Sequence, residues 1–230
     1  MGDPSPSFVD LSHQLADGMA PYPGLPDVHI GPHLDHEQSR ANYDGDEFFL
    51  GKVDMPANVG TYVDAPFHRF PDREDLSQVP LDRLVGLDGV VLDATDQESR
   101  ALGLDRPEGD IGGKAVLIRT GWDSRWGTEG YWEPGPHLTR DFAGSLIDAG
   151  VGLVGVDFWN VDDTRTRLRP IHTELLRAGV LIVEHLCHLD RLPSRGFRFF
   201  APVLGIQRGA SFPVRAFAEL DRRPEEAPSS

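Results

Sequence analysis

Four short apolar runs stand out along the middle of the chain, at residues 89–92, 115–118, 151–156 and 180–183. Short runs rich in Val, Leu and Ile, bounded by glycine or polar residues, are typical of buried strands. Segments between the last three runs carry helix signals. Residues 139–149 begin with Thr139 as a cap and stop before a glycine, and residues 169–178 open with a proline and end at a glycine. Strands that alternate with helices predict an α/β fold.

The flanking segments have a different pattern. Residues 8–67 are rich in Pro, Gly and alternating positions, which predicts strands and long loops rather than helices. The first seven residues and the charged, Pro/Ser-rich residues 222–230 are predicted to be flexible. Residues 8–221 are therefore expected to form one domain, since a chain of this length can bury a single large core.

Candidate chemistry gathers in residues 58–68, which read NVGTYVDAPFH. Tyr62 and Asp64 are two apart and share a face on an extended chain, and Asn58 joins them if the strand is regular. Pro66 breaks the regularity, and His68 follows. These polar residues converge on a site, or else they belong to a turn whose Asp and Thr satisfy backbone donors. Spacing alone leaves both interpretations open.

Two further regions add candidates. Glu184 closes an apolar run, where an ionisable group is costly unless it is paired or ligated, and His172 lies in the preceding helix. The alternative for Glu184 is a salt bridge at a sheet edge, and the alternative for His172 is a solvated position on the helix. Residues 121–132 hold Trp122, Trp126 and Trp132, which either wall a pocket for a flat substrate or pin down a surface loop.

Composition limits the partners. The net charge of −15 argues against nucleic acid or an anionic membrane as a partner. No apolar run reaches the roughly 18 residues of a membrane helix, and no secretory signal is recognisable at the N-terminus. Cys187 is the single cysteine, which is expected of a cytoplasmic protein.

With these residues in view, the chain resembles the cyclase family that includes bacterial kynurenine formamidase and isatin hydrolase. The family signature is H-x-G-T-H-x-D-x-P-x-H, and residues 58–68 match it in register except at the two ligand histidines, Asn58 and Tyr62 here. Other landmarks support the resemblance over nearly the full length: Asp10 to His13, Tyr22 to Gly24, Arg119 to Trp122, Ile182 to Asp190 and Phe212 to Ala216. The resemblance implies a single α/β domain with a β-barrel-like mixed core and surrounding helices, assembled as a homodimer or homotetramer.

The resemblance also implies a site. Typical members bind Zn²⁺ or Mn²⁺ through both motif histidines, the Asp, a later His and a later Glu, and use the last motif His as acid or base. Asp64, His172, Glu184 and His68 occupy the retained positions. Without the two histidines, tight zinc binding is not expected, because a carbonyl is a weak zinc ligand and a phenol must first lose its proton. No cofactor is expected, beyond a weakly held Mn, Mg or Zn ion on Asp64, His172 and Glu184.

Three functions follow for a small-molecule site of this kind. The first is an enzyme of specialised metabolism that closes a ring, dehydrates or isomerises a small carbonyl compound. His68, Tyr62, Asp64 and Glu184 would then be catalytic, and Asn58 and the three tryptophans would bind substrate. The second is a metal-dependent hydrolase of an amide, lactam or lactone, and the third is a non-catalytic relative that only binds a small molecule.

Overall fold

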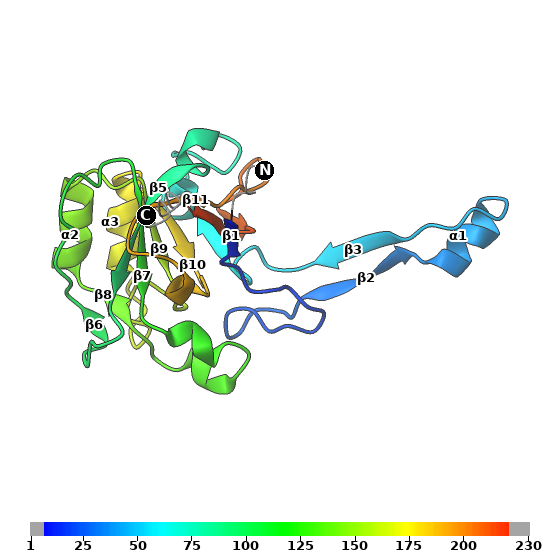
Figure 1. Cartoon of the computed structure of the whole chain (residues 1–230). Helices are drawn as coiled ribbons and strands as arrows, with labels where there is room; N and C mark the ends of the chain where they lie inside the picture. The colour runs from blue at the N-terminus through cyan, green and yellow to red at the C-terminus, as the bar shows by residue number, and fades with distance from the viewer. Residues whose placement is uncertain (1–6, 221–230) are drawn as a thin grey trace, which may run out of the picture.

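One curled sheet of nine strands forms the body of the protein in the computed structural model, which describes residues 7–220 (Figure 1). The strand order is β1-β13-β11-β5-β7-β9-β10-β4-β12. Their bounds are β1 Ser7–Asp10, β4 Tyr62–Asp64, β5 Leu87–Asp93, β7 Ala115–Arg119, β9 Leu153–Val156, β10 Leu181–Glu184, β11 Phe197–Phe200, β12 Ser211–Pro213 and β13 Phe217–Leu220. Strands β5, β7, β9 and β10 are parallel, and the outer pairs are antiparallel. The predicted α/β domain with a barrel-like mixed core is confirmed.

The four predicted strands are the four parallel ones, because each is apolar on both faces. Leu117 and Leu153 contribute to the core inside the curl of the sheet, together with residues of β11 and β13. Their neighbours Ile118 and Val154 point the other way, into a second core beneath the helices. Alternate residues of one apolar run thus build two cores.

Helices α2 (Arg140–Asp148) and α3 (Pro170–Arg177) cover the outer face of the parallel strands. Both were predicted, and their ends follow from the residues expected to set them. Thr139 caps α2 by accepting a hydrogen bond from the backbone N–H of Phe142 at 3.3 Å, and Pro170 starts α3. The remaining short elements are β6 Ala101–Leu102, β8 His137–Leu138, η1 Pro66–His68, η2 Leu81–Arg83, η3 Trp122–Arg125, η4 Glu129–Trp132 and η5 Leu189–Arg191.

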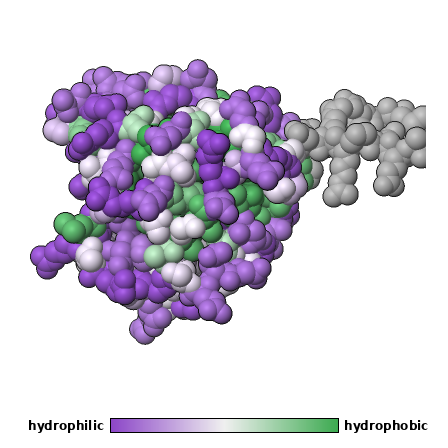
Figure 2. All heavy atoms as spheres, turned by 90° about the vertical axis from the view of Figure 1, so that its left-hand side faces the viewer, coloured by the Kyte–Doolittle hydropathy of each residue, from purple (hydrophilic) through white to green (hydrophobic). Residues whose placement is uncertain are grey.

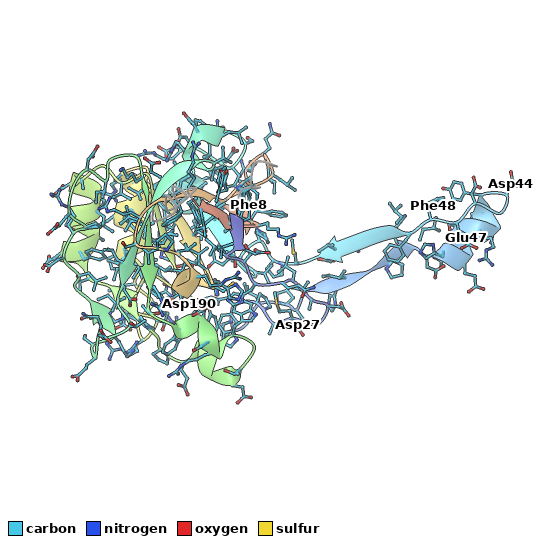
Figure 3. The ribbon with its side chains drawn as sticks, viewed as in Figure 1. Phe8, Asp27, Asp44, Glu47, Phe48 and Asp190 are labelled. Carbon is cyan, nitrogen blue, oxygen red and sulfur yellow. The ribbon has the colours of Figure 1, made fainter. Side chains whose placement is uncertain are left out.

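A long arm projects from the body (Figures 1 and 3). It consists of the antiparallel strands β2 (His29–Leu34) and β3 (Leu50–Asp54), with helix α1 (His36–Asn42) near its tip. The prediction of strands and loops without helices is wrong at α1. The Asp35 side chain caps this helix while Gln38 bonds back to the Asp35 backbone, so a capping box specifies a helix too short to show a periodic pattern.

The ends of the chain are described only in part. Ser7 lies in β1 and pairs with Leu220 of β13, so the sheet includes the last of the seven residues predicted to be flexible. Residues 1–6 and the predicted tail 222–230 lie outside the described residues. Within residues 7–220, no helix is long and apolar enough to cross a membrane.

Candidate active site

Strands β4 and β10 place the first two candidates side by side. The strands are antiparallel, and Tyr62 is paired with Glu184 in their register. Directly opposed residues share one face of a sheet, so the two side chains meet. The Tyr62 hydroxyl donates to Glu184 Oε2 at 2.5 Å, and Glu184 Oε1 accepts from the backbone N–H of Val161 at 2.8 Å. Both oxygens of this fully buried carboxylate therefore have partners.

The Gly-Thr pair of the motif positions the start of β4. Gly60 has φ +63°, and a Cβ there would lie 2.6 Å from the Leu15 side chain, so a larger residue would strain the backbone and displace Leu15. Thr61 Oγ1 donates to the carbonyl of His185 at 2.5 Å and accepts from the His13 backbone N–H at 3.0 Å. The hydroxyl ties the beginning of β4 to the end of β10, which fixes Tyr62 against Glu184.

Asp64 lies two residues further along β4, and its side chain is fully buried. Its Oδ1 accepts from the hydroxyl of Ser211 on β12, and the Asn58 amide nitrogen is 3.5 Å from the same oxygen. His68 Nδ1 lies 3.3 Å from Ser211 Oγ and 3.7 Å from Asp64 Oδ1. Asp64 Oδ2 has no hydrogen-bond partner among the described residues. Tyr62 and Asp64 share a face of β4 as predicted, whereas Asn58 precedes the strand and reaches the same site through Asp64.

His172 completes the cluster from helix α3. Its Nδ1 is 2.6 Å from Asp162 Oδ2, and Asp162 also accepts the backbone N–H groups of Ile171 and His172. Asp162 thereby holds the first turn of the helix and the imidazole together. The other ring nitrogen, Nε2, lies 3.4 Å from Glu184 Oε1 and 3.6 Å from Asp64 Oδ2. One imidazole thus stands between two buried carboxylates.

The proximity of these charges shifts their pKa values. Burial opposes a charge on His172, but Glu184, then Asp162 and Asp64, raise its pKa to about 10. Burial raises the pKa of Glu184 to about 7 against the attraction of His172. For Asp64, burial is outweighed by His68 and His172, and its pKa is lowered. Burial and then Glu184 raise the pKa of Tyr62 well above 10, so the phenol keeps its proton. A charged imidazole beside ionised Asp64 is the expected state at neutral pH.

A pocket of about 220 Å³ opens onto this cluster. It is lined by Tyr22, Leu25, Asn58, Tyr62, His68, Asn160, Arg169 and His172. Asp64 and Glu184 lie beneath this lining and are completely shielded from solvent. Tyr62 and His68 can therefore touch a bound molecule directly, whereas the two carboxylates act through them.

Comparison with known proteins identifies the family of this chain. A family model described as "Putative cyclase" matches residues 9–163, more than half of the 230 residues. The chain belongs to this cyclase family. Kynurenine formamidase from Salinibacter ruber is 31% identical to it, over 91% of this chain and 96% of that protein.

Two solved structures share the fold of this cyclase-family chain. An isatin hydrolase bound to the product analogue thioisatinate superposes with a TM-score of 0.81, 24% identity and coverage of 94% of this chain and 93% of that one. A structure described as a potential metal-dependent hydrolase with cyclase activity gives a TM-score of 0.74 at 23% identity, covering 96% of this chain and 100% of that one. The relatives named for an activity are enzymes, so the cyclase-family chain belongs among enzymes.

The cyclase-family chain retains part of a metal-binding donor set. Asp64, His68 and His172 each offer one ligand atom, and these atoms lie within 4.8 Å of one another. The unpartnered Asp64 Oδ2 is one available donor. This set has His68 in the place where Glu184 was expected, and both Glu184 oxygens accept a hydrogen bond from another group. The donors can hold a divalent ion, but Tyr62 keeps its proton and His172 must first lose one.

The three tryptophans lie away from the lining of this pocket. Trp122 Nε1 donates to the Tyr131 carbonyl at 3.0 Å, Trp126 stacks on His13 with ring centroids 3.8 Å apart, and Trp132 packs against Trp159. His13, Trp126, Tyr131, Trp132 and His185 form what we call the aromatic cluster. The loop is thus anchored by its aromatic rings, and substrate binding by Trp122, Trp126 and Trp132 stays a prediction.

Sequence reasoning missed several residues of the site. Asn160, Arg169 and Tyr22 line the pocket, and Ser211 bonds to both Asp64 and His68. These residues come from four separate segments, and no spacing in the sequence connects them. Two consecutive aspartates, at 162 and 163, lie close to Asn160 in the sequence. Of these, Asp162 orients His172, whereas Asp163 pairs with Arg165 at 2.7 Å.

Proposed function

We propose that this cyclase-family chain is an enzyme of specialised metabolism that closes a ring, dehydrates or isomerises a small carbonyl-containing intermediate by acid/base catalysis. One observation carries the proposal. Tyr62 occupies a ligand position of the family motif, lines the pocket, and donates to buried Glu184 at 2.5 Å. A phenol and a carboxylate thus form a proton-transfer pair where other members are expected to place a metal ligand.

The Tyr62–Glu184 pair supports proton exchange with a substrate. A proton taken from the substrate by the phenolic oxygen can be matched by movement of the phenolic proton to Glu184, so no phenolate has to form in the buried site. In the reverse direction, protonated Glu184 lets the Tyr62 hydroxyl turn toward an oxyanion that develops on the substrate. The same pair therefore serves proton removal and proton donation.

His68 supplies the second acid or base. It lines the pocket, and its Nδ1 faces Ser211 and Asp64, which leaves Nε2 for the substrate. An imidazole suits this role because each of its two ring nitrogens can donate or accept a proton. Two acid/base groups on one pocket suit enolisation, dehydration and ring closure, in which a proton leaves one atom and arrives at another.

A divalent ion held by Asp64, His68 and His172 would polarise a carbonyl or activate a water when bound. Such a site requires His172 to release the proton that it holds between Asp64 and Glu184. We therefore propose that any ion is held weakly.

Kinetics of Tyr62→Phe test the proposal. Small carbonyl compounds are incubated in D₂O, and exchange of their α-protons is followed by NMR with and without EDTA. We expect exchange that survives EDTA, and a kcat lowered about 10²-fold by Tyr62→Phe with a smaller change in KM. N-formylkynurenine and isatin, assayed in parallel, should be hydrolysed far below the common enzyme rate of about 10 s⁻¹. Rapid hydrolysis that EDTA abolishes would overturn the proposal.

The alternative is a metal-dependent hydrolase of an amide, lactam or lactone. The donor group of Asp64, His68 and His172 favours it, as does the similarity to kynurenine formamidase. It predicts hydrolytic activity that rises with added Mn²⁺ or Zn²⁺, which the same assay would detect.

We also propose a cytoplasmic homodimer in which a second copy covers the arm. The arm exposes six large apolar side chains: Ile30 39%, Tyr43 53%, Phe48 38%, Phe49 53%, Leu50 50% and Val53 54%. Every residue of β3 is exposed, and Asp44, Glu47 and Phe48 at the tip contact nothing of the body (Figure 3). An isolated two-stranded ribbon is at best marginally stable in water. The side of the body opposite the arm is mostly hydrophilic, with an apolar area near its centre (Figure 2).

Light scattering after size-exclusion chromatography tests the assembly. We expect the wild-type chain to elute with twice the mass of 25.4 kDa, and the triple variant Phe49→Ser, Leu50→Ser, Val53→Ser to elute as a monomer. Leu81→Ser, which removes a side chain that is 66% exposed on the body, is the matched control and should stay dimeric. A monomeric wild type at micromolar concentration would remove the arm from any role in assembly.

A further inference from the structure

Arg169 stands at the wall of the pocket with part of its hydrogen-bonding capacity free. Its Nη1 donates to the carbonyls of Thr166 and Leu168, both at 2.8 Å, and its Nη2 donates to the Tyr22 hydroxyl at 3.2 Å. A guanidinium has five N–H donors. Nε and one Nη2 hydrogen therefore have no acceptor among the described residues. The contacts that exist fix the plane of the group without using all of its donors.

The charge of Arg169 is also uncompensated. No carboxylate of residues 7–220 lies within 4.0 Å of its guanidinium, although the chain carries a net charge of −15. Nearby Asp163 is paired with Arg165 and Arg100 instead. A fixed, unpaired guanidinium beside a pocket attracts an anion, and its planar edge matches the two oxygens of a carboxylate.

Asn160 provides an independent donor on the same pocket. The residue is only 6% exposed, and its Oδ1 accepts the backbone N–H of Asp162 at 2.9 Å. This bond orients the amide, and Nδ2 has no acceptor within the described part of the chain. Because Asn160 lines the pocket, the free amide hydrogens are available to a bound molecule. The Tyr22 hydroxyl, which accepts from Arg169, keeps its own hydrogen as a third donor.

The donors and the buried carboxylates occupy different parts of the site. Asp64 and Glu184 lie beneath Tyr62 and His172, where they repel an anion, whereas Arg169, Asn160 and Tyr22 present donors on the lining. The volume of about 220 Å³ is below the 300–1,000 Å³ common for ligand pockets and suits a compact molecule.

We propose that Arg169 and Asn160 form a carboxylate-binding subsite, so that the substrate is a small carboxylic acid held with its reacting carbonyl group toward Tyr62 and His68. The inference rests on the proposed function for the identity of the reacting end. The subsite itself is defined by binding alone, so it can be tested without turnover. It makes Arg169 a specificity-determining residue.

Titration calorimetry with benzoate and its neutral isostere benzamide tests the subsite. We expect the wild-type chain to bind benzoate about 10- to 100-fold more tightly than benzamide. Arg169→Met should remove this preference, and Arg169→Lys should retain part of it, because charge remains while the planar edge is lost. Arg167→Met is the matched control: this arginine is exposed, lies two positions away and is not part of the pocket lining, so its loss should leave the preference unchanged.

Asn160→Leu gives a second readout that leaves the Arg169 charge in place. This variant should weaken the binding of benzoate more than that of benzamide. The Arg167→Met control should keep the wild-type preference for benzoate. Equal binding of the two probes by wild type, no benzoate binding at millimolar concentration, or an unchanged preference in Arg169→Met would each overturn the subsite. Failure of the proposed function looks different, since a chain that hydrolyses its substrate through a metal would still prefer benzoate. Melting curves of the variants confirm that they are folded.

Discussion

Glu184 and His185 are consecutive in the sequence but belong to two regions of opposite chemistry. Glu184 faces the pocket cluster of Tyr62, Asp64 and His172, whereas His185 faces the aromatic cluster, where its Nδ1 is 2.8 Å from the Tyr131 hydroxyl. His172 and His185 are equally inaccessible to solvent. Their pKa values nevertheless move apart. The pKa of His172 is raised to about 10 by Glu184, Asp162 and Asp64, whereas that of His185 is lowered to about 3 by burial and then by His13, which outweigh the attraction of Asp64.

The difference shows that neighbouring charges, not burial, decide which histidine is charged. The pocket keeps ionised groups and an unpartnered carboxylate oxygen in the interior, an arrangement that costs stability and serves chemistry. The aromatic cluster contains neutral rings in close contact, which add packing energy. Substitutions on the pocket side should therefore change activity, and those on the aromatic side should change stability.

The largest effect is expected on the pocket side from His68→Ala. The variant should lose 10²- to 10⁴-fold in kcat/KM, because a positioned acid or base contributes about that much. Its stability should change little, since the His68 side chain is 30% exposed. Steady-state kinetics on the substrate found by the exchange assay, together with urea unfolding, measure both quantities. A folded variant with near wild-type kcat/KM would exclude His68 from the mechanism.

The pocket side should also respond to restored motif histidines. The double variant Asn58→His, Tyr62→His adds two imidazoles beside Asp64. It also removes the phenol that donates a hydrogen bond to Glu184. Each ligand should strengthen zinc binding by well over the 10- to 100-fold attributed to outer-shell partners. We expect one zinc per chain after dialysis in the double variant and substoichiometric zinc in wild type, measured by elemental analysis. A wild-type chain that keeps one zinc per chain contradicts the prediction.

On the aromatic side, Trp126→Ala should destabilise the protein by about 2 kcal/mol, less than a fully buried tryptophan would. Trp126 packs on His13, Tyr131, Trp132 and His185, and all these contacts are lost together. Thermal unfolding should shift by roughly 4–8 °C, while kcat at 25 °C stays within twofold of wild type. Trp126→Phe keeps a ring and is the control. A large loss of kcat in a folded Trp126→Ala would indicate that this tryptophan binds substrate after all.

How far the sequence predicts each region depends on local pattern. The parallel strands and helices α2 and α3 were predictable because apolar runs and caps lie within a few residues of one another. The Tyr62–Asp64 face followed from the period of a strand. Arg169, Asn160 and Ser211 could not be foreseen, because long-range packing alone brings them to the pocket.

The tryptophan loop shows a different limit. Three tryptophans in twelve residues indicated either a pocket wall or an anchored loop, and composition cannot choose between them. The structure turns Trp126 onto His13, which lies 113 positions earlier in the chain. That partner carries no signal in the sequence beyond its place in the resemblance to the family. Stacking partners of this kind depend on the whole fold.

The smallest expected effect is a pH dependence that arises from His13. Burial, and then the charge of His188, lower its pKa to about 4 from about 6.5 in an unfolded chain. The unfolded chain therefore binds this proton first as the pH falls. The stability that neutral His13 allows is complete above pH 6.5 and is lost progressively toward pH 4. At pH 5 the loss should be about 1 kcal/mol, since the ring is partly accessible to water.

His13→Phe isolates this effect because it keeps the stack on Trp126 and removes only the titrating nitrogens. The buried Nε2 has no partner among the described residues, so phenylalanine leaves no hydrogen bond broken there. Asp10 and Arg215 line the same groove but pair with each other at 2.8 Å, and His185 stays neutral over this range. Urea unfolding at pH 7.5 and pH 5 should show the wild type losing about 1 kcal/mol more than His13→Phe. Equal losses in the two proteins would mean that His13 takes up its proton in the folded state, and that the aromatic cluster tolerates a charge as the pocket does.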